Sequence, residues 1–294
     1  MDDVAWRGLA APFARGRIWT GLHAKRWHYA GVISESAFAA VAVVDLGWVA
    51  SAFAYCFDRR ARRLRADCSW LGAPVVAATV ATRPGSGARS VFAVGGDWHV
   101  VGRGPGFAMD AHLDAGAAPP SLCAIAPIQD GVASCTHKTT NLPARGWVEA
   151  GGERLSLDGG WGSLDQTSGL LARDTHWRWA AAAGPRIGLN LSAGFMGDSE
   201  NAVWVDGRLH RLAGAKFELD VSDPERPWHI RTAEGALELT FTPDGLRRQD
   251  KDLVVAASRY VMPFGTFRGR LRLGGVEVPV TDLPGVTEHH VARW

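Results

Sequence analysis

The segment AVWVDGRLHRL, residues 202–212, places an Asp-Gly pair between two short runs of strand-forming residues. Asp206 and Gly207 both tolerate the left-handed backbone conformation that a two-residue hairpin turn requires. An Asp-Gly pair in this context is the strongest short-range hairpin signal in a sequence. The segment therefore predicts two antiparallel strands joined by a tight turn.

Three further segments repeat this scheme of strand, glycine-containing turn and strand. They are GWVEAGGERLSL (146–157), RTAEGALELTFTPDGLRR (231–248) and GRLRLGGVEVPV (269–280). No long stretch repeats its apolar residues with the 3.6-residue period of a helix. A parallel sheet needs crossover helices of about ten residues or more. The sequence therefore predicts an all-β protein with antiparallel strands and local connections.

The chain is long enough to form more than one such unit. Its 294 residues exceed what one eight-stranded barrel uses, so we expect two β-barrel or sandwich units that close or cover their edges. The polar, proline-containing segment CTHKTTNLPARG (135–146) is the expected seam. This predicts an N-terminal domain at 1–145 and a C-terminal domain at 146–294.

Charge and hydropathy exclude several classes of partner. The 32 basic and 30 acidic residues are interspersed, which argues against a nucleic-acid partner. The apolar stretch 37–57 is interrupted by Asp45 and Gly47, so it predicts two strands and a bend rather than a membrane helix. The N-terminus opens with acids and lacks the apolar core of a secretory signal. We expect a cytoplasmic protein without stable membrane insertion; the sequence leaves its oligomeric state open.

The four cysteines indicate the same compartment. Cys56, Cys68, Cys123 and Cys135 form no C-x-x-C motif and have no zinc-type spacing with histidine. A chain of this size does not need disulfides for stability, so we expect buried thiols in a reducing environment.

The segment RDTHWRWA (173–180) contains the strongest candidates for catalytic side chains. Asp174, His176 and Arg178 occupy alternate positions, and Trp177 and Trp179 occupy the other parity. If the first set faces a cavity, Asp174 becomes a candidate general acid whose pKa depends on burial and on Arg178. If instead the tryptophans face inward, the polar row lies in solvent. Both faces are chemically mixed, so both interpretations remain open.

Two further acids are candidates for a second carboxylate. Glu200 and Asn201 begin the strand of SENAVWVDGRLH (199–210), where such pairs also satisfy loop backbone groups. Asp45 lies within an apolar run and needs a partner if it is buried. The candidate partners of Asp45 are in the preceding AKRWHY segment: Lys25, Arg26 and His28.

Motifs for nucleotide, metal and nucleophilic chemistry are absent. The chain has no G-x-S-x-G elbow, P-loop, dinucleotide-binding glycine motif or H-E-x-x-H. Glu288, His289 and His290 have metal-binding side chains, but neighbouring strand residues point to opposite faces, so only two of the three can share a site. We expect no metal and no other cofactor.

Five segments resemble the bacterial domain-of-unknown-function family numbered 2804, and together they span nearly the whole chain. They are KRWHYAGV (25–32), AVAVVDLGWVASAFAYCFDR (40–59), LDGGWGSLDQTSGLLARDTHWRWA (157–180), SENAVWVDGRLH (199–210) and LPGVTEHHVARW (283–294). A looser resemblance, to two-domain lipocalin-like proteins, includes the AttH-like group, carotenoid hydratases and tocopherol cyclases. It implies that the two β units are lipocalin-like.

Together these observations favour a protein that encloses a hydrophobic small molecule, isoprenoid or polyketide-like, in a β-barrel cavity. As an enzyme it would catalyse cofactor-free, acid-assisted hydration, cyclisation or isomerisation. Asp174 is then the leading acid, His176 and Arg178 position it, and Glu200 or Asp45 is the second carboxylate.

Ligand contacts are expected from four residues: Trp177, Trp179, Asn201 and Trp204. The chain holds 13 tryptophans, which pack a core or line a site for a large, flat ligand. One alternative is a carrier that binds the same ligand without turnover. Another is a tryptophan-rich carbohydrate-active protein, which the missing export signal disfavours.

Overall fold

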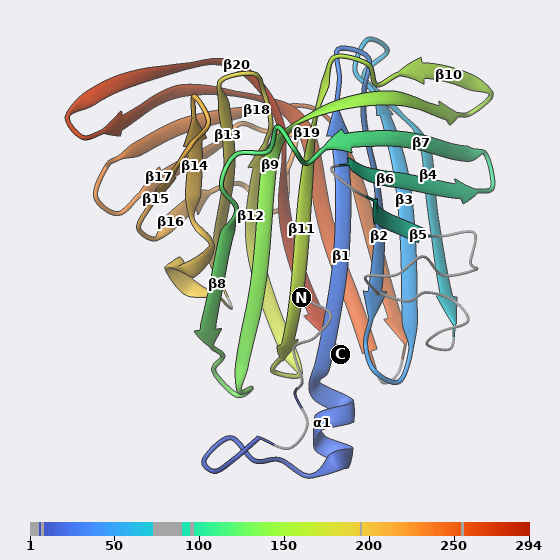
Figure 1. The fold of residues 1–294 in the computed structure, drawn as a ribbon, viewed down its shortest axis with the longest axis vertical. Coiled ribbons are helices and arrows are strands. Elements are labelled where there is room, and N and C mark those ends of the chain that lie inside the picture. The colour runs from blue at the N-terminus through green and yellow to red at the C-terminus, as the bar shows by residue number, and fades with distance from the viewer. Residues whose placement is uncertain (1–5, 7–8, 73–89, 95–96, 195, 254–255) are drawn as a thin grey trace.

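The computed structural model describes the chain at residues 6, 9–72, 90–94, 97–194, 196–253 and 256–294. In these residues the regular structure is β, apart from the helix α1 (Arg17–His23) and the 3-10 turn η1 (Gly197–Glu200) (Figure 1). The strands form two antiparallel sheets that match two lipocalin-like units, which confirms the expected fold class. Neither helix is long and apolar enough to cross a membrane.

The first sheet contains eleven strands in the order β4-β3-β2-β1-β11-β9-β7-β6-β5, and β8 and β10 also pair with β9. Their bounds are β1 (Ala24–Ile33), β2 (Ala37–Asp45), β3 (Ala50–Asp58), β4 (Arg63–Gly72), β5 (Ser90–Val94), β6 (Asp97–Gly104), β7 (Phe107–Asp114), β8 (Leu122–Pro127), β9 (Ala133–Ala150), β10 (Glu153–Ser156) and β11 (Gly160–Leu170).

The second sheet contains nine strands in the order β15-β14-β13-β12-β20-β19-β18-β17-β16. Their bounds are β12 (Asp174–Ala182), β13 (Ile187–Gly194), β14 (Ala202–Val205), β15 (Arg208–Arg211), β16 (Ala215–Glu218), β17 (Trp228–Thr232), β18 (Leu237–Leu253), β19 (Ala256–Leu273) and β20 (Val276–Arg293).

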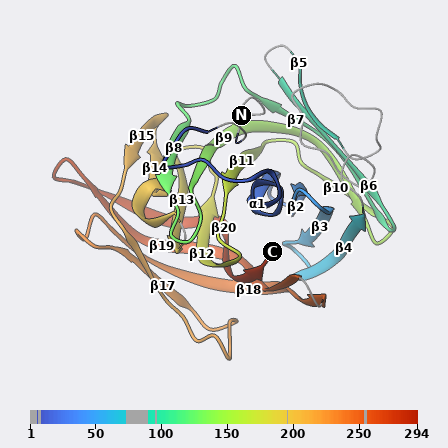
Figure 2. The same ribbon diagram turned by 90° about the horizontal axis from the view of Figure 1, so that it is seen from below.

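Each sheet curls around a core of its own, and a third core lies between the sheets (Figure 2). Met109 and Val148 belong to the first core, and Leu189 and Phe241 belong to the second. The core between the sheets includes Phe264, which stacks on one phenylalanine ring of the first sheet. The two units therefore pack face to face through apolar strands.

Strand β2 shows how one strand serves two of these cores. Ala39 and Val41 face the first core, whereas Phe38 and Ala40 face the second sheet. A strand covered on both faces has no need for polar alternation, which explains the uninterrupted apolar run before Asp45. The expected bend follows, and β3 begins at Ala50, so the prediction of two strands is confirmed.

The predicted hairpins are present, and the one in 231–248 turns at Gly235, between β17 and β18. Asp206 and Gly207, both with positive φ, connect β14 to β15, and Gly274 and Gly275 connect β19 to β20. The Pro243–Gly245 segment makes no turn. It forms a bulge within β18, because that strand continues its pairing with β19 on both sides of the irregularity.

The chain passes from the first sheet to the second between Leu170 and Asp174. Residue 145, at the expected seam, lies inside β9. Strand β9 continues through the polar seam because both ends of the strand have partners: β11 pairs along its first part and β7 along its second. Gly146, with φ of 129°, bends the strand where a Cβ would collide with the Asp110 carbonyl oxygen. The division into domains at 145/146 stays a prediction.

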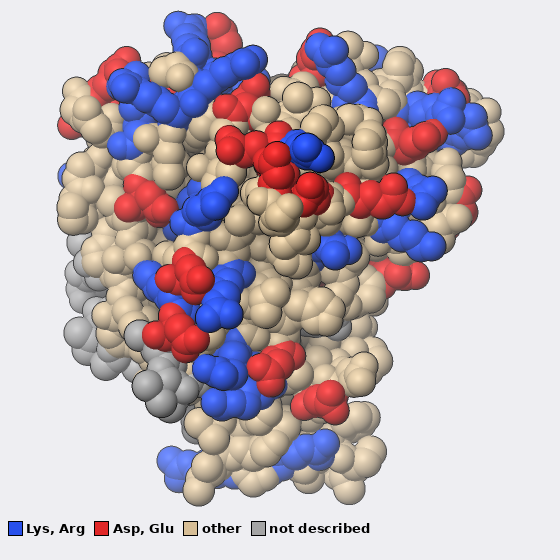
Figure 3. All heavy atoms as spheres, turned by 180° about the vertical axis from the view of Figure 1, so that it is seen from behind, with Lys and Arg blue, Asp and Glu red and all other residues tan. Residues whose placement is uncertain are grey.

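The charged residues are distributed as the sequence predicts, whereas the cysteines are not all buried. Basic and acidic side chains are intermixed over the face seen in Figure 3. All four cysteines are free, and Cys56 and Cys68 are buried, but Cys123 is exposed. The expectation of four buried thiols is wrong for Cys123, because this side chain lies on the solvent-facing parity of β8, and Cys135 is only half-buried.

Candidate functional site

A cavity of about 250 Å³ lies between the two sheets, beside the core that they share. Its walls come mainly from β1–β3 of the first sheet and from β12 and β18–β20 of the second. The expected cavity inside a barrel is wrong for this space. Side chains of the first and second cores fill the inside of each curled sheet. The cavity lies instead between the two sheets, beside strands such as β2 that are buried on both faces.

Aromatic rings form much of the cavity wall. Trp27, Trp177 and Trp294 make a row of nearly parallel rings, with centroids 6.5 Å and 6.4 Å apart. Tyr29 meets Trp179 edge to face at 5.9 Å. Such rings offer large apolar surfaces with few polar groups, which suits a flat or isoprenoid ligand.

A carboxylate, an imidazole and a hydroxyl form a chain on this wall. Glu288 Oε1 accepts a hydrogen bond from Trp177 Nε1 at 2.8 Å and lies 3.1 Å from His290 Nδ1. His290 Nε2 lies 2.9 Å from Ser258 Oγ. The Glu288 and His290 side chains are only 11% and 13% exposed. This is an arrangement in which a proton can move between neighbouring groups.

The parity of β20 determines which of its three adjacent polar residues join this chain. Glu288 and His290 point to the cavity, and His289 points to the opposite face, beside Arg178. Burial lowers the pKa of His289, and the Arg178 guanidinium lowers it further. The argument that only two of the three can share a site therefore holds.

A second polar group also lines the cavity. Lys138 on β9 places its Nζ 2.5 Å from Asp165 Oδ2 and 3.4 Å from Glu200 Oε1, and the lysine and glutamate side chains are 5% and 4% exposed. Burial alone lowers the pKa of Lys138, but the two carboxylates outweigh it and raise the pKa above its ordinary value. The ammonium therefore stays charged between two acids.

A buried arginine connects the two sheets at another edge of the cavity. The Arg247 guanidinium lies 2.8 Å from Asp67 Oδ1 and about 5 Å from the centroids of Phe53, Tyr55 and Tyr260. Burial raises the pKa of the Tyr260 phenol, so it remains neutral. Among the described residues Tyr260 Oη has no hydrogen-bond partner, which leaves it able to contact a ligand.

The row of Asp174, His176 and Arg178 does not line the cavity. Asp174 and His176 are exposed, and Arg178 donates to the Phe217 carbonyl oxygen on the other face of β12. The interpretation that this row faces the cavity is wrong. The tryptophans of the opposite parity face it instead, because they pack against the apolar strands of the first sheet.

The remaining predicted residues are divided between the cavity and the scaffold. Glu200 lines the cavity. Asp45 does not, since its Oδ1 accepts from Gly47 N in the bend after β2. Asn201 is buried in the scaffold and accepts from Ser192 N, and the buried Trp204 donates to the Pro120 carbonyl oxygen.

Sequence reasoning did not assign five cavity residues a catalytic or binding role: Lys138, Asp165, Arg247, Ser258 and Tyr260. Their contacts come from other strands: Lys138 lies opposite Asp165, Arg247 donates to Asp67, and Ser258 lies near His290. The one available signal was Glu288-x-His290, two titratable residues with the spacing of one strand face.

Comparison with known proteins places the chain in a family. The model of a family described as domain of unknown function 2804 (DUF2804) matches residues 13–294. The chain belongs to this family. A search of curated proteins found no match for this DUF2804 protein.

Solved structures share the fold of this DUF2804 protein. Kievitone hydratase from Nectria haematococca aligns with a TM-score of 0.60 at 8% identity, covering 92% of this chain and 88% of its own. A putative AttH from Nitrosomonas europaea aligns at 0.57 and 13% identity, covering 97% and 96%. CghA, solved with Sch210972, aligns at 0.56 and 11% identity, covering 92% and 88%. At such low identity the likeness shows the fold alone.

Proposed function

We propose that this protein binds a largely apolar small molecule, isoprenoid or polyketide-like, between its two sheets. There it catalyses acid-assisted hydration, cyclisation or isomerisation without a cofactor. The observation that carries this proposal is the Glu288–His290 pair, which places proton-transferring groups beside the aromatic rings of the cavity wall. The hydratase with a similar fold supports the same class of chemistry.

The Glu288–His290 pair supplies and recovers the proton in this mechanism. In a hydration, the pair delivers a proton to one carbon of an alkene, and water adds to the other carbon. The pair then takes the extra proton from the adduct, so that the net change is the addition of one water molecule. The tryptophan rings of the wall, Trp27 and Trp177, stabilise the positive charge that develops between the two steps.

Two further polar groups orient the substrate. The charged Lys138 ammonium and the neutral Tyr260 hydroxyl both border the cavity, and each can donate a hydrogen bond to a carbonyl or hydroxyl of the ligand. Glu200, held beside Lys138, is the second carboxylate of the site. Donors at two separate places fix the direction in which a slender molecule lies.

The test begins with the ligand. Small molecules extracted from the natively purified protein are identified by mass spectrometry. They are then incubated with fresh protein in D₂O or in H₂¹⁸O. Proton transfer to carbon predicts deuterium in the product, and hydration predicts ¹⁸O as well. The Glu288→Gln variant should retain the ligand and lose the labelling by about 100-fold or more, since general acid–base catalysis contributes about that much.

Asp174→Asn is the matched control, because this exposed carboxyl lies on the other face of β12 and should label product as the wild type does. A wild-type protein that retains its ligand but never labels it is a carrier, which overturns the catalytic part of the proposal. A protein that retains no hydrophobic molecule, and binds none from a cell extract, overturns all of it.

A second candidate function is ester hydrolysis, favoured by the position of Ser258. Its Oγ lies 2.9 Å from His290 Nε2, and the other imidazole nitrogen lies 3.1 Å from Glu288. This is the order of groups in a nucleophilic serine site. Covalent labelling by a fluorophosphonate that Ser258→Ala abolishes would support hydrolysis. Labelled product from Ser258→Ala near the wild-type rate would support proton transfer alone.

A further inference from the structure

Strands β6 and β7 carry a repeated pattern on the face that points away from the first core. Val100 and Met109 are buried in that core, and the residues of opposite parity face outward. These outward positions include His99 on β6 and, on β7, Asp110 and His112. The pattern Asp-x-His occurs once on each strand, as 97–99 and 110–112.

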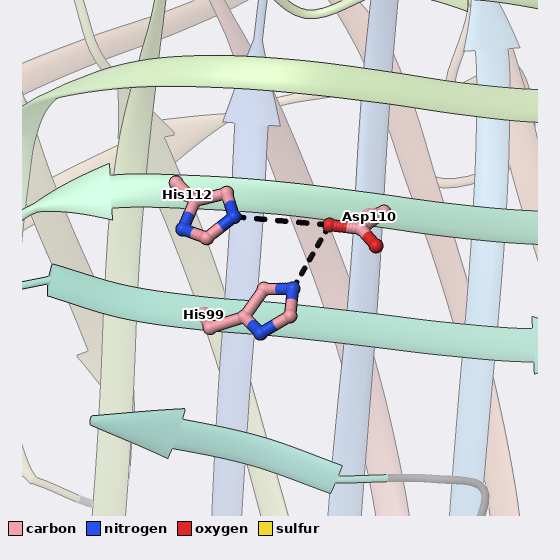
Figure 4. Close-up of side chains that lie close together, drawn as sticks. All are labelled: His99, Asp110 and His112. Atoms are coloured by element: carbon pink, nitrogen blue, oxygen red, sulfur yellow. Dashed lines mark hydrogen bonds and ion pairs between the residues drawn. The ribbon is translucent and has the colours of Figure 1, made fainter. Parts of the chain in front are cut away.

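Antiparallel pairing brings these side chains together (Figure 4). His99 and His112 are directly opposite in the register, with ring centroids 4.4 Å apart and planes 5° from parallel. Asp110 Oδ1 lies 2.9 Å from His99 Nε2 and 4.0 Å from His112 Nε2. One ligand atom from each of the three residues falls within 4.8 Å of the others.

These separations fit a tetrahedral transition-metal site. With metal–ligand bonds of about 2.0–2.2 Å, two ligands of a tetrahedral zinc ion lie about 3.3 Å apart. The distances from Asp110 Oδ1 to His99 Nε2 and to His112 Nε2 are 2.9 Å and 4.0 Å, which bracket that value. The side chains are between 35% and 37% exposed, so the stacked imidazole rings have room to rotate until their nitrogens converge, and an ion can enter from solvent.

Neighbouring charges favour a cation at this position. Asp97 Oδ2 lies 3.9 Å from His112 Nδ1, where a carboxylate can orient a metal-ligating imidazole through its second nitrogen. Asp114 lies opposite Asp97 in the register, on the same face. The carboxylates of Asp97, Asp110 and Asp114 therefore lie beside the two histidines, and Arg145 pairs with Asp97 at 2.8 Å.

We propose that His99, Asp110 and His112 bind a divalent transition-metal ion of zinc type, with the fourth position open to water. Two imidazoles and one carboxylate form a ligand set that such ions accept. The site lies on the outer face of the first sheet, whereas the cavity lies between the sheets, so the two sites are independent. Failure of the proposed chemistry in the cavity leaves this proposal untouched.

The test uses the purified full-length chain after treatment with a chelator. Titration with Zn²⁺ in a calorimeter should give one binding site per chain, and Co²⁺ should produce visible absorption typical of tetrahedral coordination. The double variant His99→Ala/His112→Ala should lose both signals. His229→Ala is the matched control, because His229 is an exposed histidine on β17 and should bind as the wild type does.

Thermal unfolding separates a metal site from a structural pair. Zn²⁺ at 100 times its dissociation constant should stabilise the wild type by about 2.7 kcal/mol and leave the double variant unchanged. Binding that survives in the double variant would place the ion elsewhere and overturn the proposal. A wild type that binds no Zn²⁺ would also overturn the proposal. If Asp110→Asn then lowered the melting temperature, the contacts of Asp110 with the two histidines would be structural only.

Discussion

The two faces of the β12–β20 strand pair differ in what they contact, although both carry titratable residues. On one face Trp177, Glu288 and His290 border a cavity and contact one another. On the other, His289 lies beside Arg178, which contacts the backbone of β16. Residue types alone do not distinguish these faces. The partner packed against each face does, and the following predictions test that difference.

The largest difference is expected between two adjacent histidines. His290→Asn keeps a donor for Glu288 but removes the imidazole, so turnover of the identified substrate should fall about 100-fold or more. His289→Asn changes the opposite face and should leave turnover within about twofold of the wild type, because that side chain is outside the cavity. Steady-state rates of the two variants check this. Equal losses of turnover in both variants would mean that the two faces do not differ in function.

A large effect on stability is expected at the second polar group of the cavity, around Lys138. Lys138→Met removes the ammonium between Asp165 and Glu200 and leaves two buried carboxylates without their cation. Breaking a buried ion pair in this way costs about 3–5 kcal/mol of unfolding free energy.

Urea unfolding of Lys138→Met measures this cost, and Lys216→Met, on an exposed position of β16, is the control. A cost below about 1 kcal/mol for Lys138→Met would show that the acids are not held by this charge.

A smaller effect separates two neighbouring tryptophans. Trp177→Phe keeps an aromatic ring in the wall but removes the N–H that donates to Glu288. A hydrogen bond to a charged group contributes about 1.5–3 kcal/mol, so turnover should fall at least about tenfold while ligand affinity changes little.

Trp179→Phe is the matched variant, since its N–H donates to Asn190 rather than to the proton-transferring pair. Its main expected loss is in stability. A turnover that falls equally in both variants would mean that ring packing, rather than the bond to Glu288, sets the rate.

The smallest effect concerns pH. Because the pKa of His289 is below its ordinary 6.5 in the folded protein, the unfolded chain takes up a proton first as the pH falls. The stability of the wild type relative to His289→Gln should therefore decrease as the pH falls below about 6.5, until the folded-state pKa is passed. Chemical unfolding at several pH values measures this difference. A relative stability that rises with acid would mean that His289 has a partner that favours its charged form.

Local sequence was sufficient for much of the fold. Turn residues such as Asp206 and Gly207 have positive φ and close their hairpin as predicted, because the requirement is met within two residues. The alternation at 174–179 also correctly separates two faces of one strand. The bulge at Pro243–Gly245 could not be distinguished from a turn, because only the continued pairing of β18 with β19 differs.

The candidate site was less accessible. Glu288, His289 and His290 were considered only as metal ligands, two of which can share a face. The hydrogen-bond partners of Glu288 and His290, Trp177 and Ser258, come from two other strands. Asp174 was the better candidate by local pattern, yet it is exposed. Local pattern gives the parity of a strand and does not give the surface that covers it.

The sequence by itself determined antiparallel β-structure, most turns and the two faces of each strand, because these depend on backbone preferences over a few residues. Only the tertiary structure decided which face borders the cavity. That choice depends on apolar strands such as β2, which bury both faces and bring the second sheet against the first. The cavity formed between the sheets for this reason, and its acids and imidazole come from segments that only long-range packing brings together.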